Sequence, residues 1–157
     1  MWNDDRSVTH EIISRRRFGE TACAVVGRDE VETDCNGPVG RLLDALAARF
    51  GFNGLGENWV EVSLDEAKSI AGGVLEKDLA YGCAVMPRDE ATSLAERFLS
   101  LFHPDVRCFT NSNAGWPGED GRTKAYSWTP ITNATLDTGI VCFDRDRVGI
   151  LWVQDED

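Results

Sequence analysis

The C-terminal end of the chain constrains its fold more than any other segment. Two apolar runs, residues 138–143 and 148–154, flank the charged segment 144–147, which reads Asp-Arg-Asp-Arg. Apolar runs joined by a short polar segment predict a β-hairpin. Three acidic residues, 155–157, follow the second run directly. We therefore expect two adjacent antiparallel strands with a charged turn and an acidic tip.

The second run of this hairpin is apolar on both faces. In an extended chain, alternate side chains point to opposite sides of the sheet. One face then carries Val148, Ile150 and Trp152, whereas the other carries Leu151 and Val153. This pattern favours a central strand that is covered on both sides. The alternative is a strand that offers one apolar face to a partner.

Three helices are predicted in the middle of the chain. The first begins at Pro38 and runs to about residue 50, since proline suits the first turn of a helix. The second follows Ser63 and Glu66, a capping-box pair, and Gly72-Gly73 is expected to bend or split it. Pro87 opens the third, which ends near residue 103. Residues 8–17 suit a short helix or a strand.

Strands are predicted at residues 21–26, 59–62, 106–110, 124–129 and 136–143, in addition to the last run. Because helices come first and most strands come last, the order favours an α+β fold with a mainly C-terminal antiparallel sheet packed against about three helices. We expect the helices to cover one face of that sheet. The length of 157 residues predicts a single domain over residues 1–157.

The net charge of the chain indicates which classes of partner it can bind. Its 27 acidic and 16 basic residues give a formal net charge of −11. Such a charge disfavours direct contact with nucleic acid or an anionic membrane, and it favours basic partners. The basic run 15–17 is expected to be a surface cluster paired with the protein's own acids. The polar N-terminus and the odd number of cysteines favour a cytoplasmic location with reduced thiols.

Few residues suggest catalysis. His103 lies five positions before Cys108, so a Cys–His nucleophile pair is conceivable, but His103 is better explained as a helix C-terminal residue. The chain has no phosphate-binding glycine motif and no zinc spacing. The carboxylates Asp144 and Asp146 are better explained as parts of a solvated hairpin turn than as ligands of a metal ion. The sequence therefore predicts no enzyme activity, no metal and no cofactor.

A binding surface is the remaining prediction. A polar loop carries Trp116 beside Glu119 and Asp120, which combines an aromatic anchor with carboxylates. The alternative is that Trp116 covers the core. The other predicted partner-binding residues belong to the hairpin turn and the tip: Asp144, Asp146, Asp155, Glu156 and Asp157.

In size, acidity and α+β character, the chain resembles the bacterial immunity proteins that neutralise toxin enzymes. The resemblance spans the whole chain and includes no diagnostic motif, so no residue role follows from it. It implies a protein inhibitor that presents carboxylates to a basic protein partner, toxin or nuclease-like, as a monomer or homodimer. A phage-encoded inhibitor of a nucleic-acid-binding defence complex has the same general properties. Two further alternatives are a small cytosolic enzyme with a Cys/His or carboxylate site, and a homo-oligomer that pairs through the terminal hairpin.

Overall fold

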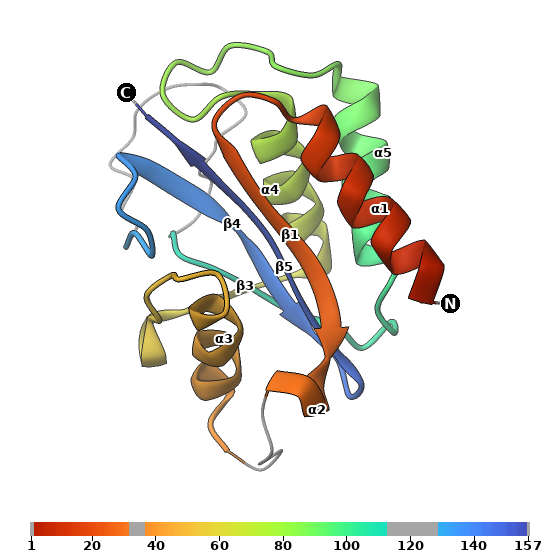
Figure 1. Cartoon of the computed structure of the whole chain (residues 1–157), viewed down its shortest axis with the longest axis vertical. Coiled ribbons are helices and arrows are strands. Elements are labelled where there is room, and N and C mark those ends of the chain that lie inside the picture. Colours follow the sequence, from red (N-terminus) through yellow and green to blue (C-terminus); the bar gives the residue numbers. More distant parts are fainter. Residues whose placement is uncertain (1, 32–36, 113–128, 157) are drawn as a thin grey trace.

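A five-stranded antiparallel sheet forms the centre of the computed structural model, which describes residues 2–31, 37–112 and 129–156 (Figure 1). Its strands stand in the order β1-β5-β4-β3-β2. The expected α+β class with an antiparallel sheet is confirmed. The bounds are Glu20–Gly27 for β1, Val60–Val62 for β2, Arg107–Thr110 for β3, Leu136–Phe143 for β4 and Arg147–Asp155 for β5. The predicted strand at 124–129 lies almost wholly outside the described residues.

The terminal hairpin, β4 and β5, occupies the middle of the sheet. β5 pairs with β4 on one side and with β1 on the other, so both of its edges are used. Its residues from Val148 to Val153 are all buried. The prediction of a central strand covered on both sides is therefore confirmed. β1 covers the outer edge of β5 and β3 pairs with β4 from Val141 to Phe143, so pairing of this hairpin with a copy of itself stays a prediction for the rest of the β4 edge alone.

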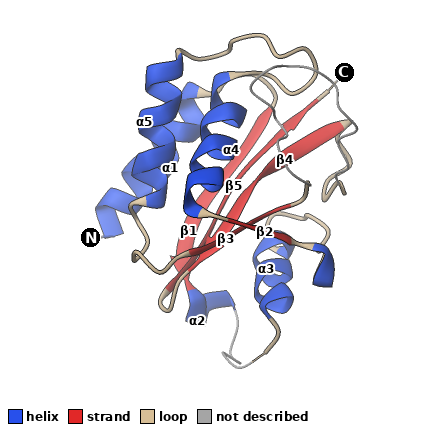
Figure 2. Cartoon of the chain, turned by 180° about the vertical axis from the view of Figure 1, so that it is seen from behind, coloured by secondary structure: helices blue, strands red, loops and turns tan. Residues whose placement is uncertain are grey.

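Helices cover both faces of the sheet, so the expectation that they cover one face is wrong (Figures 1 and 2). On one face, α1 (Trp2–Arg15), α4 (Leu64–Glu76) and α5 (Arg88–Leu99) pack over Leu151 and Val153. On the other, α3 (Val39–Ala48) packs over Ile150 and Trp152. The physical reason is that β5 is apolar on both faces, and each face has to be removed from water.

The three predicted helices are present, and a fourth occupies the N-terminal segment that was open between helix and strand. Ser63 and Glu66 form the expected capping box at the start of α4. Gly72-Gly73 does not split this helix, which runs unbroken from Leu64 to Glu76. Burial of Ala71, Val74 and Leu75 against the sheet outweighs the weak helix propensity of the two glycines.

Two short helical segments complete the described elements. α2 (Arg28–Val31) follows β1, and the 3₁₀ helix η1 (Gly56–Asn58) lies between α3 and β2. Trp59, next to η1, meets Trp152 of β5 edge to face with ring centroids 6.0 Å apart. In the described part of the chain, no helix combines the length and the apolar character that a membrane crossing requires.

Candidate functional site

The structure divides the predicted partner-binding residues into three groups. Four of them lie outside the described residues: Trp116, Glu119, Asp120 and Asp157. Two others, Asp144 and Asp155, are buried. The last two, Asp146 and Glu156, are exposed carboxylates at opposite ends of β5, so the described members of the set do not form one continuous surface.

Asp155 was expected to act outward, and this is wrong. Its side chain and that of Arg16 are both 0% exposed. The guanidinium of Arg16 donates two hydrogen bonds to the Asp155 carboxylate, at 3.2 and 3.0 Å. The backbone N–H of Leu79 donates a third, at 2.7 Å. The surface interpretation of the basic run 15–17 also fails for Arg16, whereas Arg15 pairs with Glu90 as expected.

Asp144 is a structural residue of the β4–β5 turn. Only 3% of it is exposed, and its carboxylate accepts the backbone N–H groups of His103, Asp146 and Arg147 at 2.7–2.8 Å. Burial opposes ionisation, but these three donors outweigh it and lower the pKa of Asp144 below its ordinary value of 3.8. The Asp144 carboxylate is therefore occupied by hydrogen bonds within the protein and is not presented to a partner. Asp146, in the same turn, remains exposed and pairs with the His103 ring at 2.8 Å.

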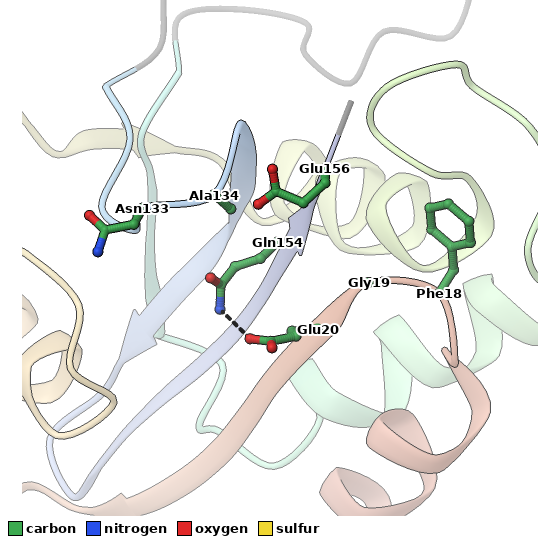
Figure 3. Close-up of a pocket in the computed structure, with 7 residues that line it drawn as sticks. All are labelled: Phe18, Gly19, Glu20, Asn133, Ala134, Gln154 and Glu156. Atoms are coloured by element: carbon green, nitrogen blue, oxygen red, sulfur yellow. Dashed lines mark hydrogen bonds between the residues drawn. The ribbon is translucent and has the colours of Figure 1, made fainter.

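Glu156 lines a pocket of about 420 Å³ at the C-terminal end of β5. Figure 3 shows Gln154 and Glu156 between Phe18 on one side and Asn133 and Ala134 on the other. The lining comes from the turn between α1 and β1, the segment before β4, and the end of β5. It comprises Phe18, Gly19, Glu20, Asn133, Ala134, Gln154 and Glu156.

Tight backbone packing holds the first of these segments in place. Gly19 has a φ of +67°, a conformation that favours glycine. A Cβ atom there would lie 2.3 Å from the carbonyl oxygen of Gln154, so the turn can pack against β5 only because residue 19 has no side chain. This turn leaves Phe18 46% exposed at the pocket and starts β1 at Glu20.

Two carboxylates give the pocket its charge. Glu20 accepts a long hydrogen bond of 3.4 Å from Gln154 Nε2, and Glu156 accepts one of 2.6 Å from Thr135 Oγ1. Within the described residues neither carboxylate takes part in an ion pair, unlike Glu61, which pairs with Arg107 and whose pKa is lowered by that contact. An open pocket with two uncompensated carboxylates and an exposed phenyl ring can accept a cationic side chain.

Sequence reasoning found Glu156 but missed Glu20 and Phe18. These two residues precede the first predicted strand, far along the chain from the acidic tip. The pairing of Glu20 with Gln154 across β1 and β5 is what brings them to the tip. Gly19, between Phe18 and Glu20, indicates a turn before the first strand. Nothing in the sequence indicated which strand β1 would pair with.

The residues of the alternative Cys–His site are not arranged as a surface pair. Cys108 is 1% exposed, and its sulfur lies 3.2 Å from that of Cys142 on the neighbouring strand. Burial, followed by the contact with Cys108, raises the pKa of Cys142 well above its ordinary value. The His103 ring instead contacts Asp146. Over the part of the chain that the structure describes, no three His, Cys, Asp or Glu side chains are grouped to hold a metal ion.

Comparison with protein families, with curated proteins and with solved structures found no match to this chain.

Proposed function

We propose that the protein is an acidic inhibitor that binds and neutralises a basic protein in the cytoplasm, with a bacterial toxin enzyme as the expected partner. The observation that carries the proposal is the pocket at the end of the sheet. There Glu20 and Glu156, neither in an ion pair among the described residues, line the same pocket as the exposed side chain of Phe18.

The chemistry of this pocket suits one long basic side chain from the partner. The methylene groups of an arginine or lysine would pack on Phe18, and the cation would meet the two carboxylates. Hydrogen bonds between ionised groups are roughly twice as strong as neutral ones. The contact would therefore contribute specificity as well as affinity.

The charge of the whole chain supports the same partner class. A net charge of −11 attracts a basic protein over a distance and can raise the association rate by roughly 10–10³-fold at low salt. An enzyme that acts on nucleic acid carries basic residues where it binds phosphates. Carboxylates presented to those residues would block the substrate site, as the resemblance to immunity proteins implies.

The test is capture of partners on the immobilised full chain at low and at high salt, followed by purification of each retained protein. We expect a basic protein that is retained at low salt and released at high salt. Its enzymatic activity should fall as the full chain is added in stoichiometric amounts. Retention of no basic protein, or of one whose activity is unchanged, would contradict the proposal.

A matched pair of variants tests the pocket itself. The double variant E20Q/E156Q removes two charges at the pocket, and E57Q/E96Q removes two exposed charges elsewhere. We expect E20Q/E156Q to raise the Kd for the captured protein by roughly tenfold or more, because each charged hydrogen bond contributes about 1.5–3 kcal/mol. The control variant has the same net charge and should change only the association rate. Equal effects of both variants would show that the pocket is not the site.

A further inference from the structure

The segment before β4, residues 131–135, forms one wall of the pocket at the end of β5 and is called the pocket wall below. Asn133 and Ala134 line the pocket (Figure 3), and Thr135 Oγ1 donates the 2.6 Å hydrogen bond that the Glu156 carboxylate accepts. The pocket wall is neither helix nor strand. Within the described part of the chain, none of its residues after the first bonds through its backbone to another backbone group. Side chains therefore have to fix its shape.

A single buried carboxylate, that of Asp137, supplies these bonds. Asp137 is the second residue of β4 and is 0% exposed. Its Oδ2 atom accepts hydrogen bonds from the backbone N–H and from the hydroxyl of Thr132, at 3.1 and 2.7 Å. Its Oδ1 atom accepts the backbone N–H of Ile131 at 3.2 Å. The Thr132 hydroxyl in turn accepts the N–H of Ala134 at 3.0 Å, which extends the hydrogen bonding to a residue that lines the pocket.

The core of the protein holds the same carboxylate from the other side. Asp137 Oδ1 also accepts the indole N–H of Trp152 at 3.1 Å and the side-chain N–H of Asn111 at 3.2 Å. Both of these residues are buried, Trp152 in β5 and Asn111 directly after β3. The carboxylate thus joins the pocket wall to the middle of the sheet.

The chemistry of these contacts explains why a carboxylate occupies this buried position. All five groups that bond to Asp137 are donors, and three of them belong to the pocket wall. A carboxylate accepts on both oxygens, whereas an asparagine amide would turn a donor toward one side. Among the described residues no cation pairs with Asp137, so hydrogen bonds alone compensate the cost of burying it.

We propose that Asp137 and Thr132 are positioning residues of the pocket. They hold the pocket wall in the shape that receives a basic side chain, and they place Thr135 where it bonds to Glu156. The inference rests on the proposed function, in which this pocket binds a cationic side chain of the partner. Neither Asp137 nor Thr132 lines the pocket, so both act through residues that do. A pocket wall that is fixed before binding does not have to be ordered on association, which lowers the cost of binding.

Thr132 is the position at which the proposal is tested, because replacement of Asp137 would also remove its bonds to the core. Thr132→Val keeps the shape of the side chain but removes the hydroxyl, which bonds to both Asp137 and Ala134. Thr132→Ser keeps the hydroxyl and is the conservative variant. Ser63→Ala removes the cap of α4 and no pocket residue, so it is the control for a general loss of stability.

The probe is the blocked tripeptide acetyl-Gly-Arg-Gly-amide at millimolar concentration, and the same peptide with uncharged citrulline is its matched control. Binding to the full chain is followed by NMR through the amide signals of Gly19 and Ala134. We expect saturable shifts with the arginine peptide and none with the citrulline peptide. The Kd should rise roughly three- to tenfold in T132V and stay unchanged in T132S and S63A.

Two further measurements separate order in the pocket wall from stability of the fold. In T132V the backbone order parameter of Ala134 should fall from about 0.85 toward about 0.6, and in S63A it should not fall. T135V changes only an exposed residue and removes the bond to Glu156, so it should also weaken peptide binding, whereas T135S should not. An unchanged order parameter in T132V, or an unchanged Kd in T135V, would overturn the positioning role.

The variant E20Q/E156Q separates failure of this inference from failure of the proposed pocket. Weaker peptide binding in E20Q/E156Q with an unchanged Kd in T132V would overturn the positioning role and leave the pocket as the site. Equal rises of the Kd in S63A and T132V would overturn it as well, because the effect would then be general destabilisation. A full chain that binds no arginine peptide would overturn the pocket and the positioning role together, while capture of a basic partner would still decide whether the protein is an inhibitor.

Discussion

At the scale of single residues, the buried ion pair of Arg16 and Asp155 connects three parts of the fold. Beyond Asp155, the guanidinium donates to the backbone carbonyls of Phe18, Val74 and Lys77. It therefore ties the end of α1 to the end of α4 and to the last residue of β5. A charge in this position is costly unless every donor has an acceptor, and the many contacts meet that condition.

We predict that Asp155→Ala lowers the free energy of unfolding by about 3–5 kcal/mol, because Arg16 is left as an unpaired buried charge. Chemical denaturation of the full chain measures this. The double variant R16M/D155L should lose less than the single one, since it removes both charges. As an exposed control, Glu61→Ala breaks the pair with Arg107 and should cost less than about 1 kcal/mol. A D155A effect as small as that of E61A would contradict this account.

At the scale of elements, two glycines that each lie inside a regular element have opposite effects on packing. Gly72 lies within α4, and a Cβ atom added there would meet nothing within 4 Å. Gly139 lies in β4, and a Cβ atom there would be 2.0 Å from the carbonyl oxygen of Leu151. The first residue only weakens its helix, whereas the second allows β4 to lie close to β5.

We therefore predict that Gly72→Ala raises the free energy of unfolding by about 0.5–1 kcal/mol, in line with the difference in helix propensity. Gly139→Ala should lower it, because the methyl group meets backbone atoms that cannot rotate away. The midpoints of urea unfolding at neutral pH measure both changes. Shifts of the same sign in both variants would show that backbone contact does not distinguish the two sites.

At the scale of the whole molecule, stability depends on carboxylates that bind protons more weakly when folded. Burial opposes ionisation of Asp144, but its backbone donors lower the pKa below 3.8. The pKa of Glu66 is lowered below 4.5 by its hydrogen bonds to Ser63, and that of Glu61 by Arg107. Folded values below the unfolded values mean that the contribution is complete above the unfolded pKa and is lost as the pH falls through the folded pKa.

We expect the Tm to fall as the pH is lowered below 4.5 and to fall more steeply below 3.8. Thermal unfolding followed by circular dichroism between neutral and acidic pH tests this. The variant D144N, which cannot ionise, should be less stable than the full chain at neutral pH and should lose less on acidification. Parallel pH profiles of D144N and the unchanged chain would refute a contribution from Asp144.

The sequence by itself determined the local elements of this protein. The apolar residues on both faces of the last run predicted a strand buried on both faces, and Ser63 with Glu66 predicted the start of α4, because these signals depend on neighbours in the chain. Only the tertiary structure decided that helices cover both faces of the sheet, and that Asp155 is buried against Arg16 while Glu156 remains exposed. It also decided that β1 joins β5, which brings Glu20 and Phe18 to the acidic tip. The physical reason is that strand pairing and charge burial depend on contacts between distant segments, which no local pattern of residues specifies.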